Sequence, residues 1–166
     1  MSILEMNEKR INKFIKFLEK KNVLDIRIPR AHRAFILIKP EKLRDAVKYI
    51  KEEMGIIHIS TITAVDLEDK IEVIYHLTDK NLSIALKVQV PIDSPVVDSI
   101  SDIIEGAPFY EREIHDLMGV VSKGHPNLKK LIIPEDWPEG LYPQRKANSL
   151  QDIRKTIDGK EWSRNE

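Results

Sequence analysis

A short segment after the middle of the chain carries acids and histidines whose types could do chemistry. Glu111, Glu113 and Asp116 could supply paired carboxylates for general acid–base catalysis. His115 and His125, with Asp116 between them, could bind a metal ion. No nucleophile or orienting partner accompanies the carboxylates, and the histidines lack the close pairing of a metal-binding helix. We therefore expect no catalytic, cofactor-binding or metal-binding residue, and a stand-alone small metal-dependent enzyme using His115, Asp116 and His125 is the alternative.

The same residues also have a structural interpretation. Arg112 and Asp116 are four residues apart on a predicted helix, so they are expected to form an ion pair. Arg112 lies between two glutamates, which indicates an ion-pair hub buried at an interface, where removing one partner is strongly destabilising. His125 lies in a Gly-His-Pro-Asn turn and is expected to form a hydrogen bond with the backbone.

Hydrophobic periodicity predicts the elements that position these side chains. Apolar residues at helical spacing predict two helices, and alternating or β-rich runs bounded by polar breaks predict five strands. In chain order these are helix 7–21, strands 23–28 and 34–38, helix 40–55, and strands 57–65, 71–77 and 82–90. The order is α-β-β-α-β-β-β. Short links favour a mainly antiparallel sheet with helices on one face, which is an α+β fold.

The character of the chain changes after the last of these strands. Ser94 is placed to begin a helix that runs to residue 104, and residues 107–118 predict a further helix that Gly119 ends in the left-handed conformation. Beyond it the chain is rich in proline and glycine, and the tail from residue 144 is polar. We therefore expect an α+β core over residues 1–105. In the same domain, residues 106–166 form a helix and an extended irregular C-terminal arm.

Composition describes an ordinary single domain without a strong charge. The chain has 166 residues, 42% hydrophobic and 33% charged, with 27 basic and 27 acidic residues and a net charge of +0; the charged fraction favours a thermophilic source. Neutrality argues against a nucleic-acid binder. The absence of cysteine excludes thiolate-bound iron–sulfur and zinc sites. No run approaches the ~18 apolar residues of a membrane span, so we expect membrane association only through partners.

The most informative pattern lies in residues 109–146. An ERE triplet is followed by an acid and a glycine, a GHP turn, a basic pair, a proline with two acids and a tryptophan, and a closing Arg-Lys pair. The residues of this pattern are Glu111, Arg112, Glu113, Asp116, Gly119, Gly124, His125, Pro126, Asn127, Leu128, Lys129, Lys130, Pro134, Glu135, Asp136, Trp137, Arg145 and Lys146. In order and spacing, they resemble the signature of the 30 kDa (C-type) subunit family of respiratory complex I.

Some positions depart from that family's pattern. His115 stands in place of the usual aromatic residue, Ser122 stands where an aromatic is frequent, and Ala147-Asn148 replaces a common Asp-aromatic pair. With these departures, the chain resembles more closely the corresponding subunit of archaeal membrane-bound, energy-converting hydrogenases.

The resemblance implies a scaffold role. It implies a subunit without cofactors that packs against the hydrogenase-like large subunit, beside iron–sulfur subunits, on the cytoplasmic face of the cell membrane. We therefore expect a non-catalytic peripheral-arm assembly subunit of a membrane-bound, ion-translocating redox complex. Such a complex, a hydrogenase or a complex I-like oxidoreductase, would serve electron transport in a respiratory chain or hydrogen metabolism.

The signature segment also supplies the candidate docking residues. Trp137 lies between prolines in an acidic loop, where no periodic element is available to bury it, so an interface anchor is at least as good an interpretation as a core tryptophan. The two basic pairs in the segment are weak evidence for a nucleic-acid site in a neutral chain. The expected partner-binding residues are Glu111, Arg112, Glu113, Asp116, His125, Pro126, Glu135, Asp136, Trp137, Arg145 and Lys146.

Overall fold

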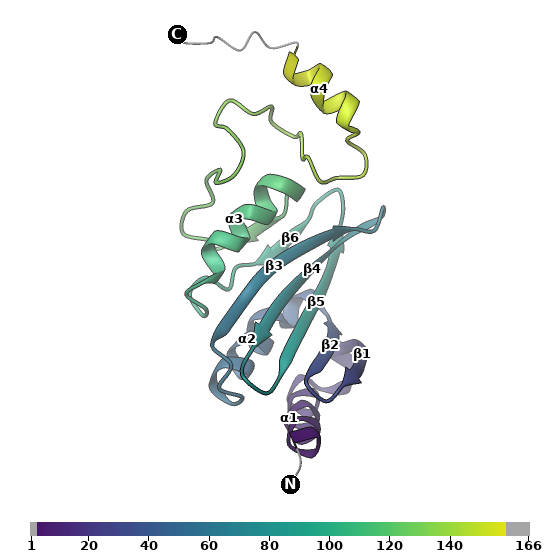
Figure 1. The fold of residues 1–166 in the computed structure, drawn as a ribbon, viewed down its shortest axis with the longest axis vertical. Coiled ribbons are helices and arrows are strands. Elements are labelled where there is room, and N and C mark those ends of the chain that lie inside the picture. The colour runs from purple at the N-terminus through teal and green to yellow at the C-terminus, as the bar shows by residue number, and fades with distance from the viewer. Residues whose placement is uncertain (1–2, 159–166) are drawn as a thin grey trace.

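The structure, a computed structural model, describes residues 3–158 (Figure 1). Its elements are α1 (Ile3–Leu18), β1 (Val23–Arg30), β2 (Arg33–Ile38), α2 (Leu43–Glu52), β3 (His58–Asp66), β4 (Lys70–Thr78), β5 (Ser83–Pro91), β6 (Val96–Asp98), α3 (Ala107–Met118), β7 (Val121–Lys123) and α4 (Leu150–Asp158). The predicted α-β-β-α-β-β-β order is confirmed for the first seven elements. The last residues of the expected arm, 159–166, lie outside the described residues.

A five-stranded sheet organises the fold. Its strand order is β1-β2-β5-β4-β3, and β2 with β5 is the parallel pair while the other pairs are antiparallel. The long β4–β5 hairpin closes through the Asp79 turn, where the Asp79 carboxylate accepts the backbone N–H groups of Asn81 and Leu82 at 2.7 Å. The mainly antiparallel sheet is therefore as expected, with one parallel junction where α2 and β3 intervene between β2 and the β4–β5 hairpin.

Helices α1, α2 and α3 pack on one face of this sheet, as predicted. Along β4, Ile71, Val73, Tyr75 and Leu77 are fully buried on this face, and the residues between them are half-buried on the other. Phe14 of α1, with α2 and α3, completes one continuous core with them. Burial of each large apolar side chain contributes about 1.5–3 kcal/mol, so this face stabilises the fold. Figure 1 shows α1 and α2 behind the sheet, which leaves its opposite face uncovered by them.

Two expectations after the sheet are wrong. Residues 94–104 do not form a helix. Instead β6 pairs in parallel with β7, with Val97 buried and Val96 and Asp98 exposed on the other side of the ladder. The buried isoleucines that follow lie in turns against the core. Residues 150–158 are helical rather than extended. Ser149 caps α4 by accepting the N–H of Asp152 at 3.2 Å, and Ile153 is buried.

The C-terminal arm as a candidate subunit interface

The C-terminal arm packs against helix α3. The helix begins after Gly106 and ends where Gly119 takes the predicted left-handed conformation, with φ of 71°. A side chain at Gly119 would also meet the Tyr142 ring, because a Cβ there would lie 2.5 Å from ring carbons. The glycine therefore does two things: it stops the helix and lets the returning arm pack against the helix end.

Glu111 is a buried carboxylate on the inner side of α3. One oxygen accepts the backbone N–H of Ile100 at 2.8 Å, and the other accepts the hydroxyl of Ser99 at 2.7 Å. Burial raises the pKa of Glu111, while these two hydrogen bonds oppose the shift. The carboxylate thus holds the turns after β6 against α3, which explains why residues 99–104 pack into the core without forming a helix.

Arg112 and Asp116 do not pair with each other within the described chain, contrary to the expectation. The Arg112 guanidinium donates to the carbonyl oxygens of Lys129 and Lys130 at 2.7 and 2.6 Å. The Asp116 carboxylate is buried, and one of its oxygens accepts the next two backbone N–H groups of the arm, both at 2.7 Å. The ion pair does not form because the backbone of residues 129–132, which has no regular secondary structure, offers each side chain two hydrogen bonds.

The two histidines bind the backbone. His125 Nδ1 accepts the N–H of Asn127 at 3.0 Å, so Nε2 carries the proton and donates to the Pro108 carbonyl at 3.1 Å. This confirms the expected turn histidine. His115 Nδ1 lies 3.0 Å from the Val120 carbonyl oxygen. Over residues 3–158 no group of three or more His, Cys, Asp or Glu side chains could hold a metal ion, so the metal-enzyme alternative finds no support there.

The end of the signature ties the returning chain to the body. Arg145 donates to the carbonyl oxygens of Met118 and Ile92 at 2.7 and 3.0 Å, and it stacks over the Tyr142 ring at 5.3 Å. The backbone N–H of Lys146 donates to the buried Asp66 carboxylate at the end of β3, at 3.0 Å. Arg145 thereby supplies a cation where the α3 carbonyls are left unpaired.

Trp137 is half-buried in the arm. Its indole N–H donates to the Leu141 carbonyl at 2.7 Å, which closes a turn within the acidic loop. Lys130 reaches across and donates to the carbonyl oxygens of Glu135 and Trp137 at 2.7 and 3.0 Å. These groups surround a hollow of about 480 Å³. The tryptophan is thus neither a core residue nor a fully exposed one.

Other side chains of the arm point outward. Of the expected docking residues, Pro126, Glu135 and Asp136 are exposed and Glu113 is half-buried. Two further apolar side chains are exposed between them: Leu131 by 41% and Ile132 by 52%. Their backbone N–H groups are the ones that Asp116 binds. The sequence alone assigned these two residues no role, because an apolar run this short has no periodicity from which exposure could be predicted.

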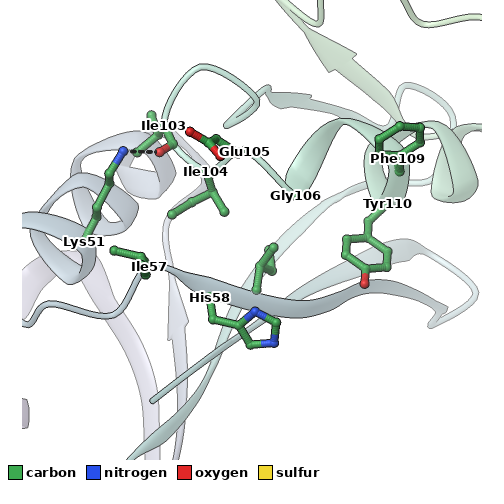
Figure 2. A pocket seen from close by; sticks show the side chains of 10 residues that line it. Lys51, Ile57, His58, Ile103, Ile104, Glu105, Gly106, Phe109 and Tyr110 are labelled. Carbon is green, nitrogen blue, oxygen red and sulfur yellow. Dashed lines mark hydrogen bonds between the residues drawn. The ribbon is translucent and has the colours of Figure 1, made fainter.

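A separate apolar groove of about 660 Å³ lies beside α3, between its first turn and the start of β3 (Figure 2). Ile57 and Phe109 on its walls are 69% and 62% exposed. Lys51 donates to the Ile103 carbonyl at 2.6 Å and so fixes one wall. Neither apolar residue stood out in the sequence, because exposure at a strand start and on a helix face follows from packing alone.

Comparison with known proteins gives the class. The profile of the family described as the respiratory-chain NADH dehydrogenase 30 Kd subunit matches residues 36–154. A relative in Methanosarcina mazei, the C-type subunit of F(420)H(2) dehydrogenase, is 32% identical over 81% of this chain and 92% of its own length. The chain belongs to this 30 Kd subunit family, which confirms the resemblance of the signature segment.

Relatives from hydrogenase-like complexes match as well. The membrane-bound hydrogenase subunit beta of Pyrococcus furiosus is 30% identical over 68% of each chain. In a structure of the membrane-bound sulfane sulfur reductase, an archaeal respiratory membrane complex, one chain superposes with a TM-score of 0.77 at 27% identity, covering 91% of both chains. The protein is therefore a subunit of the complex I-like and hydrogenase-like class of membrane oxidoreductase complexes, which take part in electron transport.

Among the helices within residues 3–158, none is long and apolar enough to cross a bilayer.

Proposed function

We propose that this chain is a non-catalytic assembly subunit in the peripheral arm of an ion-translocating membrane redox complex. In this proposal the C-terminal arm docks onto the hydrogenase-like large subunit, near iron–sulfur subunits, on the cytoplasmic face of the membrane. Family membership supports the kind of complex. The structure contributes a surface that suits docking. The signature side chains hold the arm in shape by hydrogen bonds to backbone groups of this chain.

One observation carries the proposal. Segments of the chain without regular secondary structure are held in place by buried carboxylates, and burying a carboxylate costs free energy. Glu111 and Asp116 are buried carboxylates whose hydrogen bonds go to backbone groups rather than to a substrate. A surface loop without a partner has no need of such an arrangement, because loops normally vary and move. A docking surface needs it, since a prearranged shape lowers the entropic cost of binding.

Leu131 and Ile132 give this surface its apolar centre. Asp116 orients their backbone, and both side chains remain exposed beside the acidic loop that contains Glu135. Apolar residues surrounded by a polar rim are typical of protein–protein interfaces. Trp137, which is half-buried in the acidic loop, closes a turn of that loop through its indole N–H.

The test is purification of the complex through a tagged copy of this chain. Leu131→Ser with Ile132→Ser should weaken recovery of the large subunit by about thirtyfold, since hot-spot losses reach about 2 kcal/mol. A matched control is Ile3→Ser with Leu4→Ser, because these side chains on α1 are 47% and 45% exposed and lie at the other end of the molecule.

Both variants should melt at the wild-type temperature, since neither pair is in the core. Wild-type recovery of the large subunit by the Leu131/Ile132 variant would contradict the arm as the docking surface. Equal losses in the arm and control variants would contradict it as well.

A further inference from the structure

The second surface of interest is the sheet face that α1 and α2 leave uncovered. On β2 the alternate residues Arg33, Phe35 and Leu37 point to this face, because Ala34, Ile36 and Ile38 are buried on the other. A hollow of about 580 Å³ lies over Phe35 and Leu37. The β1–β2 end of this face lies far from the arm in Figure 1, so it is a distinct candidate for binding.

At one end of this face, two arginines lie directly opposite each other. Arg30 at the end of β1 is the register partner of Arg33 at the start of β2, so both side chains leave the same side of the hairpin. Like charges at opposed positions destabilise a strand pair. Among residues 3–158, neither guanidinium has a carboxylate partner, and both residues are exposed. The isolated chain therefore carries an unneutralised repulsion here.

The rest of this face is neutralised internally. Arg27 pairs with Asp25 at 3.1 Å, and Lys87 pairs with Glu72 at 2.7 Å while it lies over the Phe35 ring. His76, on β4 near Arg33, has its pKa lowered by burial and then by the charges of Arg33 and Lys87. Since His76 is thus uncharged at neutral pH, the excess positive charge of the face belongs to the two opposed arginines.

We infer that the Arg30–Arg33 pair and the adjoining Phe35 hollow bind an acidic segment of a neighbouring subunit. Two adjacent guanidinium groups can bind carboxylates through paired hydrogen bonds, and the partially exposed Phe35 and Leu37 offer apolar contact beside them. This inference rests on the proposed function, because it needs a complex with subunits. The inference adds a second interface to the one proposed at the arm, so this chain would contact two neighbouring subunits rather than one.

A photo-crosslink in the intact complex tests the inference directly. The probe is p-benzoyl-phenylalanine at Ser83, which is the register neighbour of Arg33 on β5 and whose side chain lies on the same face. We expect a crosslinked peptide that carries a net negative charge and belongs to a subunit other than the one at the arm. Absence of a crosslink, a crosslink to lipid or nucleic acid, or a neutral or basic peptide would overturn the inference.

Charge variants supply the second measurement. Arg30→Gln with Arg33→Gln should leave the melting temperature of the isolated chain unchanged or raise it, because the repulsion is removed. The same variant should lower recovery of the crosslinked subunit by about tenfold or more. Lys13→Gln with Lys16→Gln on the exposed side of α1 is the control, with the same loss of charge and no expected loss of the subunit.

The outcomes separate this inference from the function proposed above. If the wild-type tagged chain recovers no redox-complex subunit, the proposed function fails and the inference fails with it. If the wild type recovers the complex but the Arg30/Arg33 variant recovers every subunit equally well, only the inference fails. A variant that melts well below wild type would show that the pair is structural, and would also overturn it.

Discussion

Arg112 and Asp116, one turn apart on α3, bind the same stretch of the arm through opposite polar groups. Arg112 donates to two consecutive backbone carbonyl oxygens at 2.7 and 2.6 Å, and Asp116 accepts the next two backbone N–H groups at 2.7 Å. Four consecutive residues without regular secondary structure thus have backbone groups satisfied by one face of a helix. This clamp lets an irregular arm keep a defined shape.

The clamp predicts local loosening when it is broken. Asp116→Ala leaves two N–H groups of residues 131–132 without their acceptor, at a cost of about 1–3 kcal/mol for each group that stays buried. Hydrogen exchange of these amides should become about tenfold faster or more, while exchange in β4 changes little. Glu113→Ala on the outer side of α3 is the control, and equal exchange rates in the two variants would contradict the clamp.

Glu111 predicts a pH dependence of stability. Its pKa is raised by burial, so its contribution to stability is fully present below the unfolded-state pKa of about 4.3 and is lost as pH rises through the folded-state value. Glu111→Gln removes this loss. Denaturant unfolding from pH 4 to pH 8 should therefore show the free energy of unfolding of wild type falling relative to the variant as pH rises.

The comparison between the two proteins isolates Glu111 from the rest of the chain. Asp66 and Asp79 have lowered pKa values and give the opposite slope, but they are present in both proteins and cancel in the difference. A wild-type curve parallel to that of Glu111→Gln would show that the carboxylate has no raised pKa.

Gly119 predicts a steric effect beyond its backbone conformation. Gly119→Ala should cost about 1–2 kcal/mol for the left-handed conformation, plus the displacement of the Tyr142 ring. Gly124→Ala is matched, since φ there is 88° and nothing lies within 4 Å of the added carbon. Urea unfolding should give a clearly larger loss for Gly119→Ala, and equal losses would mean that the ring moves freely.

Trp137 predicts a separation of docking from folding. Trp137→Ala should weaken docking to the large subunit by about 2 kcal/mol or more, because the turn that it closes and the exposed part of its side chain are both lost. The melting temperature of the isolated chain should change little, since Trp137 lies outside the core. Trp137→Phe keeps the ring but not the N–H, so its docking should be intermediate. A large fall in melting temperature would mean that Trp137 belongs to the core.

Sequence reasoning succeeded wherever a repeating period reported burial. The alternation along Lys70–Thr78 and the helical spacing over Ala107–Met118 predicted β4 and α3, because a strand buries every second side chain and a helix buries one face. It failed for β6, which has three residues, and for α4, whose cap at Ser149 was not recognised. Both elements are short, so the spacing of their apolar residues is too brief to be distinguished from that of the flanking loops.

The sequence by itself determined the family, the α+β class and the segment that matters, since composition and ordered motifs are properties of the chain alone. Only the tertiary structure decided what the signature side chains do. Glu111, Arg112 and Asp116 bind backbone groups 11–18 residues away, and no residue type marks such partners, because every residue has the same amide. The exposure of Leu131 and the opposition of Arg30 and Arg33 likewise arise from packing and register, which become defined only when the sheet and arm are assembled.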